Sequence, residues 1–427
     1  MKRLIIVFGM LLMLCSCAVE PNDVAYIVAL GFDKGENENY QVTLQFAKPN
    51  KISGGSSEEG GSTGSEIVEN ITVEAPNMYS AINIANNIVS KTFSLSHTKL
   101  VVFSEEIAKE GLSQIVSTMI RSDDLRPDVF VAVARESSKD YLDSVNPLIE
   151  VNPAKYYQLI FHDSKSFGVP RTNLQRFYFN EKLKNRNSVL PLVGTNDIKS
   201  EESSAGGSKQ DSSESENSKG NEPQNKKSKE SKINDGKFEY KIKNYKAGEV
   251  VINGKIKSEA MGMVLFDGDR AVGEFGSVEC EIYNLLWGNI GKGYISFANS
   301  LSNEPVTVKL TKNKSPKYKV DRKNKKIRVE LFLESDLYSI PSEFDSDEDI
   351  DKFEESAKSD IETSCHDFIV NMRDIYSADV IGFGFELKKS FLTNKAFNEY
   401  DFMADYKNYD IEVDVDFKIR RTGMKYE

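Results

Sequence analysis

The sequence predicts an α+β fold with mixed or antiparallel sheets, each covered by helices. Three patterns lead to this prediction. In the first third of the chain, segments rich in β-branched and aromatic residues alternate with segments of helical periodicity. In the last third, three segments alternate apolar with polar residues, which is typical of strands with one face in water. Between two of these strands, apolar residues recur every three or four positions from Ile350 to Ile375, which predicts a long amphipathic helix.

The first third opens with a predicted β-hairpin. Residues 24–32 and 40–47 are rich in strand-forming residues, and a polar stretch beginning with Asp33-Lys34-Gly35 separates them. Residues 51–65 are mainly Gly, Ser and Glu without periodicity, which indicates a flexible loop. Further along we expect a helix over residues 77–90, a strand over 98–103, a helix over 105–120, a strand over 127–134 and a short helix from Lys139 to Val145.

The middle of the chain contains a long polar stretch. Residues 198–236 have almost no apolar side chains, so burial cannot offset the entropy lost on ordering, and we expect disorder. Structure is expected to resume near Phe238. Two turn dipeptides then predict hairpins, Asn253-Gly254 within residues 248–256 and Asp267-Gly268 within residues 261–275. The alternating strands of the last third are expected over residues 306–310, 327–333 and 411–419.

Composition excludes several classes of protein. Hydrophobic residues make up 39% of the 427 residues, which is enough for packed cores. The net charge of −11 argues against nucleic-acid binding, because phosphate repels an acidic surface. Four cysteines are too few for a disulfide scaffold, and three histidines leave little room for a His-rich metal site. Only residues 4–14 form a long apolar run, so a polytopic membrane protein is excluded.

The N-terminus has the layout of a lipoprotein signal peptide. Two basic residues precede the apolar run at residues 4–14, which is too short to span a bilayer. Leu14-Cys15-Ser16-Cys17 then resembles a lipobox, in which an aliphatic residue and two small residues precede the cysteine that receives the lipid. Cys15 does not fit, because a large leucine directly precedes it. We therefore expect a signal peptide over residues 1–16 and a covalent diacylglycerol lipid on Cys17.

This lipid would place the protein at a membrane surface. Two acyl chains give stable attachment, whereas a single chain binds only marginally. An acidic body gains nothing from anionic lipids, so the lipid itself is expected to hold the protein. The chain is therefore predicted to be exported and tethered to the outer face of a membrane. An ordinary secretory signal with two incidental cysteines is the alternative.

Matches to catalytic motifs lack the context that the chemistry needs. Gly60-Gly61-Ser62-Thr63-Gly64 matches G-x-S-x-G, but a nucleophile elbow needs a strand before it and a helix after it, and this copy lies in the Gly/Ser loop. Gly291-Lys292-Gly293 lacks the earlier glycine and the Ser/Thr of a P-loop. The three histidines are far apart in sequence, and H-E-x-x-H does not occur. We expect no catalytic residues and no enzymatic activity.

The acidic run before the long helix resembles the opening of an EF-hand loop. Asp345, Asp347 and Asp349 have the right spacing, but the positions that need glycine and glutamate carry Ile350 and Ser356. Acidic residues at a helix N-terminus interact favourably with the helix dipole, and this explains the run better. We therefore expect no metal site and no cofactor other than the lipid on the N-terminal cysteine.

Two cysteines remain in the body of the chain. Cys365 lies on the apolar face of the predicted long helix, so we expect a core thiol. Cys280 is expected in a strand or a turn. In an exported protein these two residues could pair, and the sequence leaves this open because it does not show their separation.

Six short motifs follow the predicted lipobox in a fixed order. They are Asn22-Asp23 with Ala25–Gly35, then Ser96–Ala108, Arg121–Arg135, Leu285-Leu286-Trp287-Gly288, Ala378–Gly384 and Lys418–Gly423. Together they resemble the C-subunit lipoproteins of bacterial spore germinant receptors, the GerAC/GerBC type. Each motif is weak alone, whereas six in order behind a lipobox are specific. The chain departs from the family just after Cys17, where Ala18-Val19-Glu20-Pro21 replaces the usual Trp, Asp and basic residues.

The resemblance implies three α/β-type domains without a known catalytic role. We place them at residues 17–184 (an N-terminal α/β domain), 185–292 (a middle domain that contains the insertion at 198–236) and 293–427 (a C-terminal α+β domain). The resemblance also implies a location on the outer surface of the spore inner membrane. There the A-type and B-type membrane subunits would be the partners, and the permease-like B-type subunit is the expected nutrient site. The chain itself is expected to have a structural and coupling role in starting germination.

Gly382-Phe383-Gly384 is the candidate docking surface for a partner. Two glycines that flank a large apolar residue suggest a tight turn, and a buried structural turn is the alternative. A different function remains open, namely a solute-binding lipoprotein that delivers a small ligand to a membrane transporter. That class has two similar lobes, whereas the two halves of this sequence differ in pattern. A surface hydrolase that depends on Ser62 is a third alternative.

Overall fold

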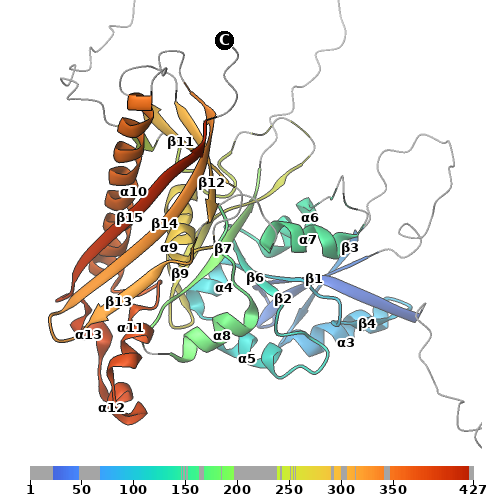
Figure 1. Cartoon of the computed structure of the whole chain (residues 1–427). Coiled ribbons are helices and arrows are strands. Elements are labelled where there is room, and N and C mark those ends of the chain that lie inside the picture. The colour runs from blue at the N-terminus through green and yellow to red at the C-terminus, as the bar shows by residue number, and fades with distance from the viewer. Residues whose placement is uncertain are drawn as a thin grey trace, which may run out of the picture.

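The computed structural model describes most of the chain after the predicted signal peptide. The described residues are 23–47, 68–145, 147, 150, 152–162, 168–183, 185–196, 238–240, 243–250, 252, 254, 256–289, 293–299, 305–312, 314–340 and 347–422. They form two sheets with associated helices (Figure 1). The fold is therefore α+β with mixed sheets, as predicted.

The first sheet contains nine of the described strands, in the order β10-β9-β7-β6-β5-β1-β2-β3, with β4 paired to β1. β1 runs parallel to β4 and β5, and β5, β6 and β7 run parallel to one another. The other pairs are antiparallel. The strands are β1 (Val24–Lys34), β2 (Tyr40–Ala47), β3 (Val68–Ala75), β4 (Thr92–Ser94), β5 (Leu100–Ser104), β6 (Phe130–Ala134), β7 (Ser188–Thr195), β9 (Ser258–Asp267) and β10 (Arg270–Phe275).

Helices cover both faces of this sheet. Successive residues of β5 show the arrangement, because Val101 and Phe103 belong to one buried cluster while Leu100 and Val102 belong to another. Strands covered on both faces have continuous apolar runs, which explains the sequence of β5. The first cluster includes side chains of α3 (Met78–Ile88), α4 (Glu105–Glu110), α5 (Ser113–Ile120) and α8 (Leu174–Lys182). The second includes side chains of α6 (Ser138–Ser144) and α7 (Pro153–Phe161).

The single helix expected over residues 105–120 is two helices, and this expectation is wrong. α4 ends just before Gly111, whose φ of +126° is a backbone conformation that other residues rarely adopt. The turn between β9 and β10 docks at this break, where Asp269 accepts hydrogen bonds from the N–H groups of Leu112 and Ser113 at 3.0 and 3.1 Å. The apolar periodicity continues across the break, so it cannot reveal a contact made by residues far along the chain.

The second sheet contains six of the described strands. Its order is β13-β14-β12-β11-β8, with β15 paired to β14. β15 runs parallel to β14 and all the other described pairs are antiparallel. These strands are β8 (Phe238–Tyr240), β11 (Tyr294–Asn299), β12 (Val306–Lys312), β13 (Lys317–Asp321), β14 (Lys326–Ser339) and β15 (Asp410–Arg421).

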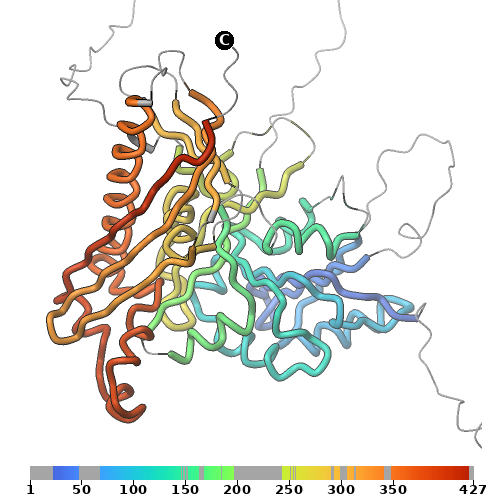
Figure 2. Tube along the Cα trace, viewed as in Figure 1, coloured from blue at the N-terminus to red at the C-terminus, as the bar shows by residue number. Residues whose placement is uncertain are grey.

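One long helix covers one face of the second sheet. α10 (Asp347–Tyr376) packs Phe353, Ile361 and Cys365 against the alternating apolar residues of β14 and β15 (Figure 1). The opposite residues of β14 are exposed or half-buried. The predicted long helix and the predicted sheet with one wet face are both confirmed. Four short segments, α11 (Phe383–Glu386), η2 (Leu387–Ser390), α12 (Asn394–Glu399) and α13 (Phe402–Tyr406), then lie beyond one end of this sheet (Figures 1 and 2).

Most of the other predicted elements are present. The two confirmed hairpins are β1–β2, over residues 24–47, and β9–β10, around Asp267-Gly268. The helices expected over 77–90 and near 139–145 are α3 and α6. The strands expected near 98–103 and 127–134 are β5 and β6. The loop at 51–65 and the stretch at 198–236 lie outside the described residues, as does Asn253 of the other expected hairpin. The described residues from 243 to 257 carry no strand, so that hairpin is not confirmed.

The segment expected as a middle domain contributes to both sheets. β7, β9 and β10 belong to the first sheet, whereas β8 belongs to the second. α9 (Ser277–Trp287) packs against β9 of the first sheet and against α10 of the second sheet unit. The division into three domains stays a prediction. Within the described residues, no helix combines the length and apolar character needed to cross a membrane.

Candidate functional site

The candidate functional site is the junction where the second half of the chain meets α8 and the start of β7. Trp287, the last residue of α9, donates a hydrogen bond from its indole Nε1 to the backbone oxygen of Val380 at 3.1 Å. The Cζ atoms of Arg176 and Arg186 lie 4.1 and 4.4 Å from the centre of the indole ring. Such cation–π contacts strengthen as water is excluded. The single tryptophan of the chain thus joins α8, the segment before β7 and the segment after α10.

Arg186 is an unusual cation in this junction. Its side chain is half-buried, and its Nε and Nη2 atoms are out of reach of water and have no hydrogen-bond partner within the described part of the chain. Burial lowers the pKa of the guanidinium, and the neighbouring charge of Arg176 adds to this effect, while Asp379 opposes it. The indole ring and the carboxylate therefore stabilise these buried atoms mainly by electrostatics and not by hydrogen bonds.

Asp379 is the anion of the junction and is only 1% exposed. Its Oδ1 accepts a hydrogen bond from the N–H of Gly382 at 2.7 Å, and its Oδ2 accepts one from the N–H of Gly384 at 2.8 Å. Burial raises the pKa of the carboxyl, whereas these N–H donors and the Arg186 guanidinium oppose the rise. The side chain of Asp379 therefore shapes the turn that follows it.

The turn at Gly382-Phe383-Gly384 lies in the interior of the molecule. Gly382 has φ +95°, and a Cβ there would stand 3.2 Å from the Nε of Arg186. A Cβ on Gly384 would stand 2.6 Å from a ring atom of Phe402, so glycine allows close approach at both positions. Phe383 is fully buried, with its ring centre 5.9 Å from that of Tyr318. This geometry is that of the alternative, a buried structural turn.

Asn187 ties this segment to the first sheet. Its N–H donates to the backbone oxygen of Asp379 at 2.9 Å, and its Oδ1 accepts from the N–H of Asp379 at 3.0 Å. Its Nδ2 also donates to the backbone oxygen of Phe266 in β9 at 3.1 Å. One buried amide side chain thus connects β9, the residue before β7 and the segment after α10. Such a satisfied polar link rigidifies the place where the two sheet units meet.

A hollow opens next to the junction. It has a volume of about 680 Å³ and lies between the end of α8 and the short helices that follow α10. The lining combines basic, aromatic and acidic side chains. The residues are Lys182, Leu183, Asn185, Arg186, Phe385, Lys388, Phe397, Asn398, Glu399, Tyr400 and Asp401.

The first sequence motif has a structural role at the end of β1. Asp33 is buried and accepts hydrogen bonds from the N–H and the Oγ of Ser138, both at 2.7 Å, and from the N–H of Lys139 at 3.0 Å. It thereby satisfies N–H groups at the start of α6, which have no partner within the helix. A Cβ on Gly31 would stand 2.6 Å from the Oγ of Ser138, so glycine allows this close approach. The motif therefore fixes α6 on the first sheet.

Several predicted residues lie outside the described part of the chain. These are Cys17 with the signal peptide, the G-x-S-x-G match at residues 60–64, Asp345 of the acidic run and Gly291-Lys292. Asp347 and Asp349 fall in the first turn of α10. No group of three or more metal-ligating side chains is found among the described residues.

The two thiols in the body of the chain are both buried and free. Cys365 lies on the apolar face of α10, as expected. Cys280 lies in α9, and the expectation of a strand or turn is wrong. Nearly all of α9 is buried, so its sequence lacks a clear polar face and the helical period is hard to see. Burial raises the pKa of both thiols, to about 12 for Cys365, which leaves them unreactive.

Sequence reasoning finds one side of the junction and misses the other. It identifies the motifs that contain Trp287 and Asp379, without predicting that they meet. It misses Arg176, Arg186 and Asn187, because they lie in an ordinary amphipathic helix and a short polar stretch. The sequence signal that could have pointed to the junction is the turn at Gly382-Phe383-Gly384. Two glycines so close together indicate a backbone that other segments approach closely.

Two family models match the chain. The model described as "Spore germination protein N-terminal domain" matches residues 18–195, and the model described as "Spore germination B3/ GerAC like, C-terminal" matches residues 261–423. Together they cover most of the chain. This protein belongs to the GerAC family of spore germination proteins. The junction lies between the two matched segments, since Arg176 and Arg186 belong to the first and Trp287 and Asp379 to the second.

Curated relatives agree with this assignment. The chain is 28% identical to spore germination protein KC of Bacillus subtilis strain 168 over 160 residues, which is 36% of this chain and 39% of that protein. It is 25% identical to the putative spore germination protein YfkR of the same organism over 130 residues, which is 30% of this chain and 34% of the relative. The matches thus span between a third and two fifths of the relatives' length.

A crystal structure of the GerBC protein is also similar to this chain. The alignment covers 92% of this chain and 97% of that one, with 14% identity and a TM-score of 0.48.

Proposed function

We propose that this chain is the lipid-anchored C subunit of a nutrient germinant receptor. Its role would be non-catalytic, in assembly of the receptor and in coupling nutrient binding to the start of germination. Membership of the spore germination family carries this proposal. The junction around Trp287 supports a coupling role, because it links the two family segments through buried and directional contacts.

The proposed partners are the A-type and B-type membrane subunits of the receptor. A lipid on Cys17 would hold the chain on the outer surface of the spore inner membrane, beside these partners. Nutrient binding is assigned to the permease-like B-type subunit, so this chain needs no nutrient pocket of its own. The lipobox at residues 14–17 supports the membrane location.

The test separates the anchor from the receptor role. In the native host, we would compare Cys17→Ala and a full deletion with the unaltered strain, and measure dipicolinate release from purified spores. One trigger would be a nutrient mixture and the other a trigger that bypasses receptors. We expect both altered strains to fail with nutrients and to respond normally to the bypass trigger.

Each strain answers a different question. A deletion strain with normal nutrient responses, in a host without a second receptor for those nutrients, would overturn the receptor assignment. A normal response in Cys17→Ala together with failure of the deletion would overturn only the need for the lipid. Loss of the bypass response would place the defect outside the receptor.

A further inference from the structure

Charge is distributed unevenly over this acidic protein. The chain has a net charge of −11, yet residues 314–328, which span β13 and the start of β14, contain eight Lys and Arg residues and one acidic residue. The body of the protein repels an anionic surface, whereas this segment attracts one. The overall charge therefore says little about which surfaces this end of the molecule can approach.

The basic segment lies against the short helices that follow α10. The Cζ of Arg322, in the turn between β13 and β14, is 4.3 Å from the ring centre of Phe391. Lys325 of the same turn pairs with Asp405 of α13. These contacts bring the turn beside α13 and beside the loop that follows η2, and η2 carries Lys388 and Lys389.

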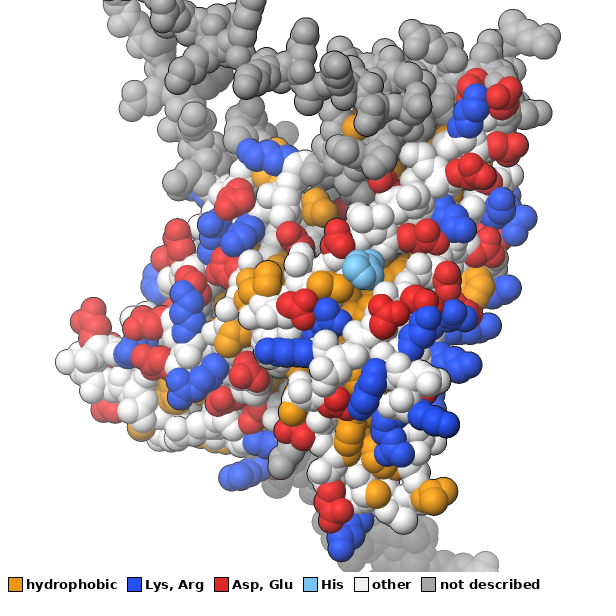
Figure 3. Space-filling view, turned by 90° about the vertical axis from the view of Figure 1, so that its left-hand side faces the viewer, with side chains coloured by type: hydrophobic (Ala, Val, Ile, Leu, Met, Phe, Trp, Pro, Cys, Tyr) orange, Lys and Arg blue, Asp and Glu red, His pale blue; other side chains and the backbone are white. Residues whose placement is uncertain are grey.

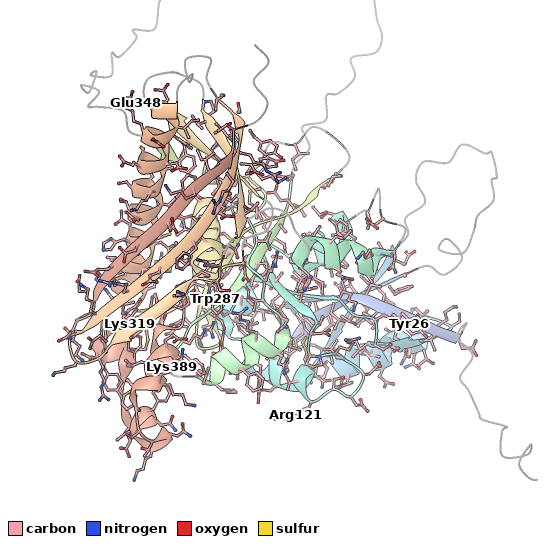
Figure 4. All side chains as sticks on the ribbon, in the orientation of Figure 1. Tyr26, Arg121, Trp287, Lys319, Glu348 and Lys389 are labelled. Carbon is pink, nitrogen blue, oxygen red and sulfur yellow. The ribbon has the colours of Figure 1, made fainter. Side chains whose placement is uncertain are left out.

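We call this end of the molecule the basic tip. Figure 4 shows Lys319 of β13 and Lys389 of η2 at this end. The tip combines cations from the β13–β14 hairpin with cations and apolar side chains from α11, η2 and the loop that follows. Its members are Lys319, Arg322, Lys323, Phe385, Lys388, Lys389 and Leu392.

Two apolar side chains of the basic tip face water. Leu392 is fully exposed, at 103% of its reference area, and Phe385 is 48% exposed. The neighbouring Phe391 packs against Phe397 and Tyr400, with ring centres 5.6 and 5.5 Å apart, so the loop that carries Leu392 is held in place. Figure 3 shows hydrophobic side chains between lysine and arginine side chains at the lower end of the molecule.

Within the described residues, four cations of the tip form no ion pair with a carboxylate, namely Lys319, Arg322, Lys323 and Lys388. Lys389 pairs with Glu386, and the lysine is well exposed. Lysines on a sheet edge also discourage strand pairing, and this would explain the lysines of β13. It does not explain the lysines of η2, nor the exposed leucine beside them.

We propose that the basic tip docks on an anionic lipid surface, with Leu392 and Phe385 entering the headgroup region and the surrounding cations contacting lipid phosphates. Exposed apolar side chains close to basic residues match such an interface, and the Nζ of Lys388 lies 5.9 Å from the ring centre of Phe385. The charge is complementary to the lipid headgroups, in contrast to the acidic remainder of the chain.

This inference rests on the proposed lipid on Cys17. Only six positions separate Cys17 from Asp23, and such a stretch reaches at most ~20 Å. A tether this short keeps the folded part close to the bilayer. Figure 4 places Tyr26, near the start of β1, and Lys389 on opposite sides of the molecule. Two contacts so far apart would fix the orientation of the protein on the membrane.

An acidic protein surface is the competing partner. The apolar part of the tip favours lipid, because it consists of side chains on a loop and a short helix and not of a broad apolar face. An acidic protein would bury cations in matched ion pairs, whereas long exposed lysines suit a fluid and laterally mobile set of phosphates.

Vesicle binding tests this proposal without the receptor. The lipid-free mature chain from residue 18 retains every described element and would be mixed with vesicles of equal parts phosphatidylglycerol and phosphatidylcholine, or of phosphatidylcholine alone. The tip variant carries Lys319→Gln, Lys323→Gln, Lys388→Gln and Lys389→Gln. The matched control carries Lys109→Gln, Lys139→Gln, Lys352→Gln and Lys358→Gln, which remove the same charge from helical ion pairs elsewhere on the surface.

We expect binding to the anionic vesicles only, and loss of that binding in about 1 M salt, where the Debye length falls to ~3 Å. Each charge near an anionic surface changes binding about fivefold, so the tip variant should bind more than about a hundredfold more weakly than the control. Leu392→Gln alone should weaken binding about tenfold. Unchanged thermal unfolding would show that the variants are folded.

Three results would overturn the proposal. The first is equal binding by the tip variant and the control, and the second is equal binding to both kinds of vesicle. The third is absence of binding to anionic vesicles, and a germination defect of the tip variant in spores would then assign the tip to a protein partner. None of these results bears on the receptor assignment, which the deletion strain tests separately.

Discussion

The first sheet is covered by helices on both faces, whereas the second sheet keeps one face in water. In β5 every residue is buried, but in β14 buried residues alternate with exposed or half-buried ones. Almost every position of a strand such as β5 therefore contributes to packing, while half of those in β14 can carry charge. The contrast explains how one end of an acidic protein can become basic without loss of its core.

The largest effect expected from this contrast concerns two phenylalanines in strands. Phe103 in β5 is fully buried and its ring centre lies 5.8 Å from that of Phe32, whereas Phe332 in β14 is half-buried on the wet face. Phe103→Ala should lower the free energy of unfolding by ~3–5 kcal/mol, and Phe332→Ala by less than ~1 kcal/mol. Urea unfolding measures both. Equal losses would show that another surface covers the wet face in solution.

The next effect concerns the junction between the two sheet units. Asp379→Ala leaves the N–H groups of Gly382 and Gly384 without their acceptor and removes an anion that stabilises Arg186, so we expect a loss of about 3 kcal/mol. Trp287 is the single tryptophan, so its fluorescence reports unfolding at this site.

Asp367→Ala is the control for this comparison. Asp367 is an exposed carboxylate on α10, paired only weakly through a surface histidine, and its loss should change stability little. Similar losses in the two variants would show that the junction is not tightly coupled to the fold.

A smaller effect depends on pH and on Glu281 of α9. Burial raises the pKa of its carboxyl to about 7, above the ordinary value of 4.5. The folded state therefore holds this proton more tightly than the unfolded state, and stability falls as pH rises from about 4.5 to about 7. Glu281→Gln should remove this fall and be more stable than the unaltered protein by ~3 kcal/mol at pH about 8.

The comparison needs two pH values and a control. At pH 4.5 the variant and the unaltered protein should have similar urea midpoints, because the carboxyl is protonated in the folded state. Glu355→Gln, an exposed glutamate on α10, should show no such difference at either pH. A Glu281→Gln variant that is less stable at the higher pH would mean that the carboxylate has a stabilising partner.

The smallest effect is expected on the wet face of the second sheet. The Nη2 of Arg328 in β14 lies 2.9 Å from the Oε2 of Glu412 in β15, and both side chains reach water. Water and salt screen such a pair, so Arg328→Gln should leave the thermal midpoint unchanged within error. A clear drop that disappears at high salt would show that the charged pairs on this face stabilise the sheet.

The sequence predicts elements best where one pattern persists over many residues. The alternation in β14 and the three-to-four spacing in α10 each reflect one side facing a core and one side facing water. The predictions for α9 and for the break between α4 and α5 are wrong for the opposite reason. α9 is buried almost all round, which removes the contrast, and the break at Gly111 depends on Asp269 from a distant hairpin.

The junction is harder to predict than the elements that form it. Its residues come from α8, the segment before β7, α9 and the segment after α10, and no local rule specifies that these meet. A motif such as Ala378–Gly384 indicates a constrained backbone, because close glycines do so in any context. Packing between the two sheet units places Arg186 against this turn. The local sequence does not specify that packing.

The pairing of β15 with β14 has a consequence for how the chain folds. Lys326 pairs with Asp410, so the two strands are separated by a long segment that includes all of α10. Contacts between such distant residues form slowly, because a long loop must close first. During synthesis, this edge of β14 stays unpaired until nearly the whole chain has emerged and β15 can bind to it. Truncation shortly before Asp410 would leave that edge open to pairing with a second molecule. By covering the edge, β15 also protects the folded chain from aggregation.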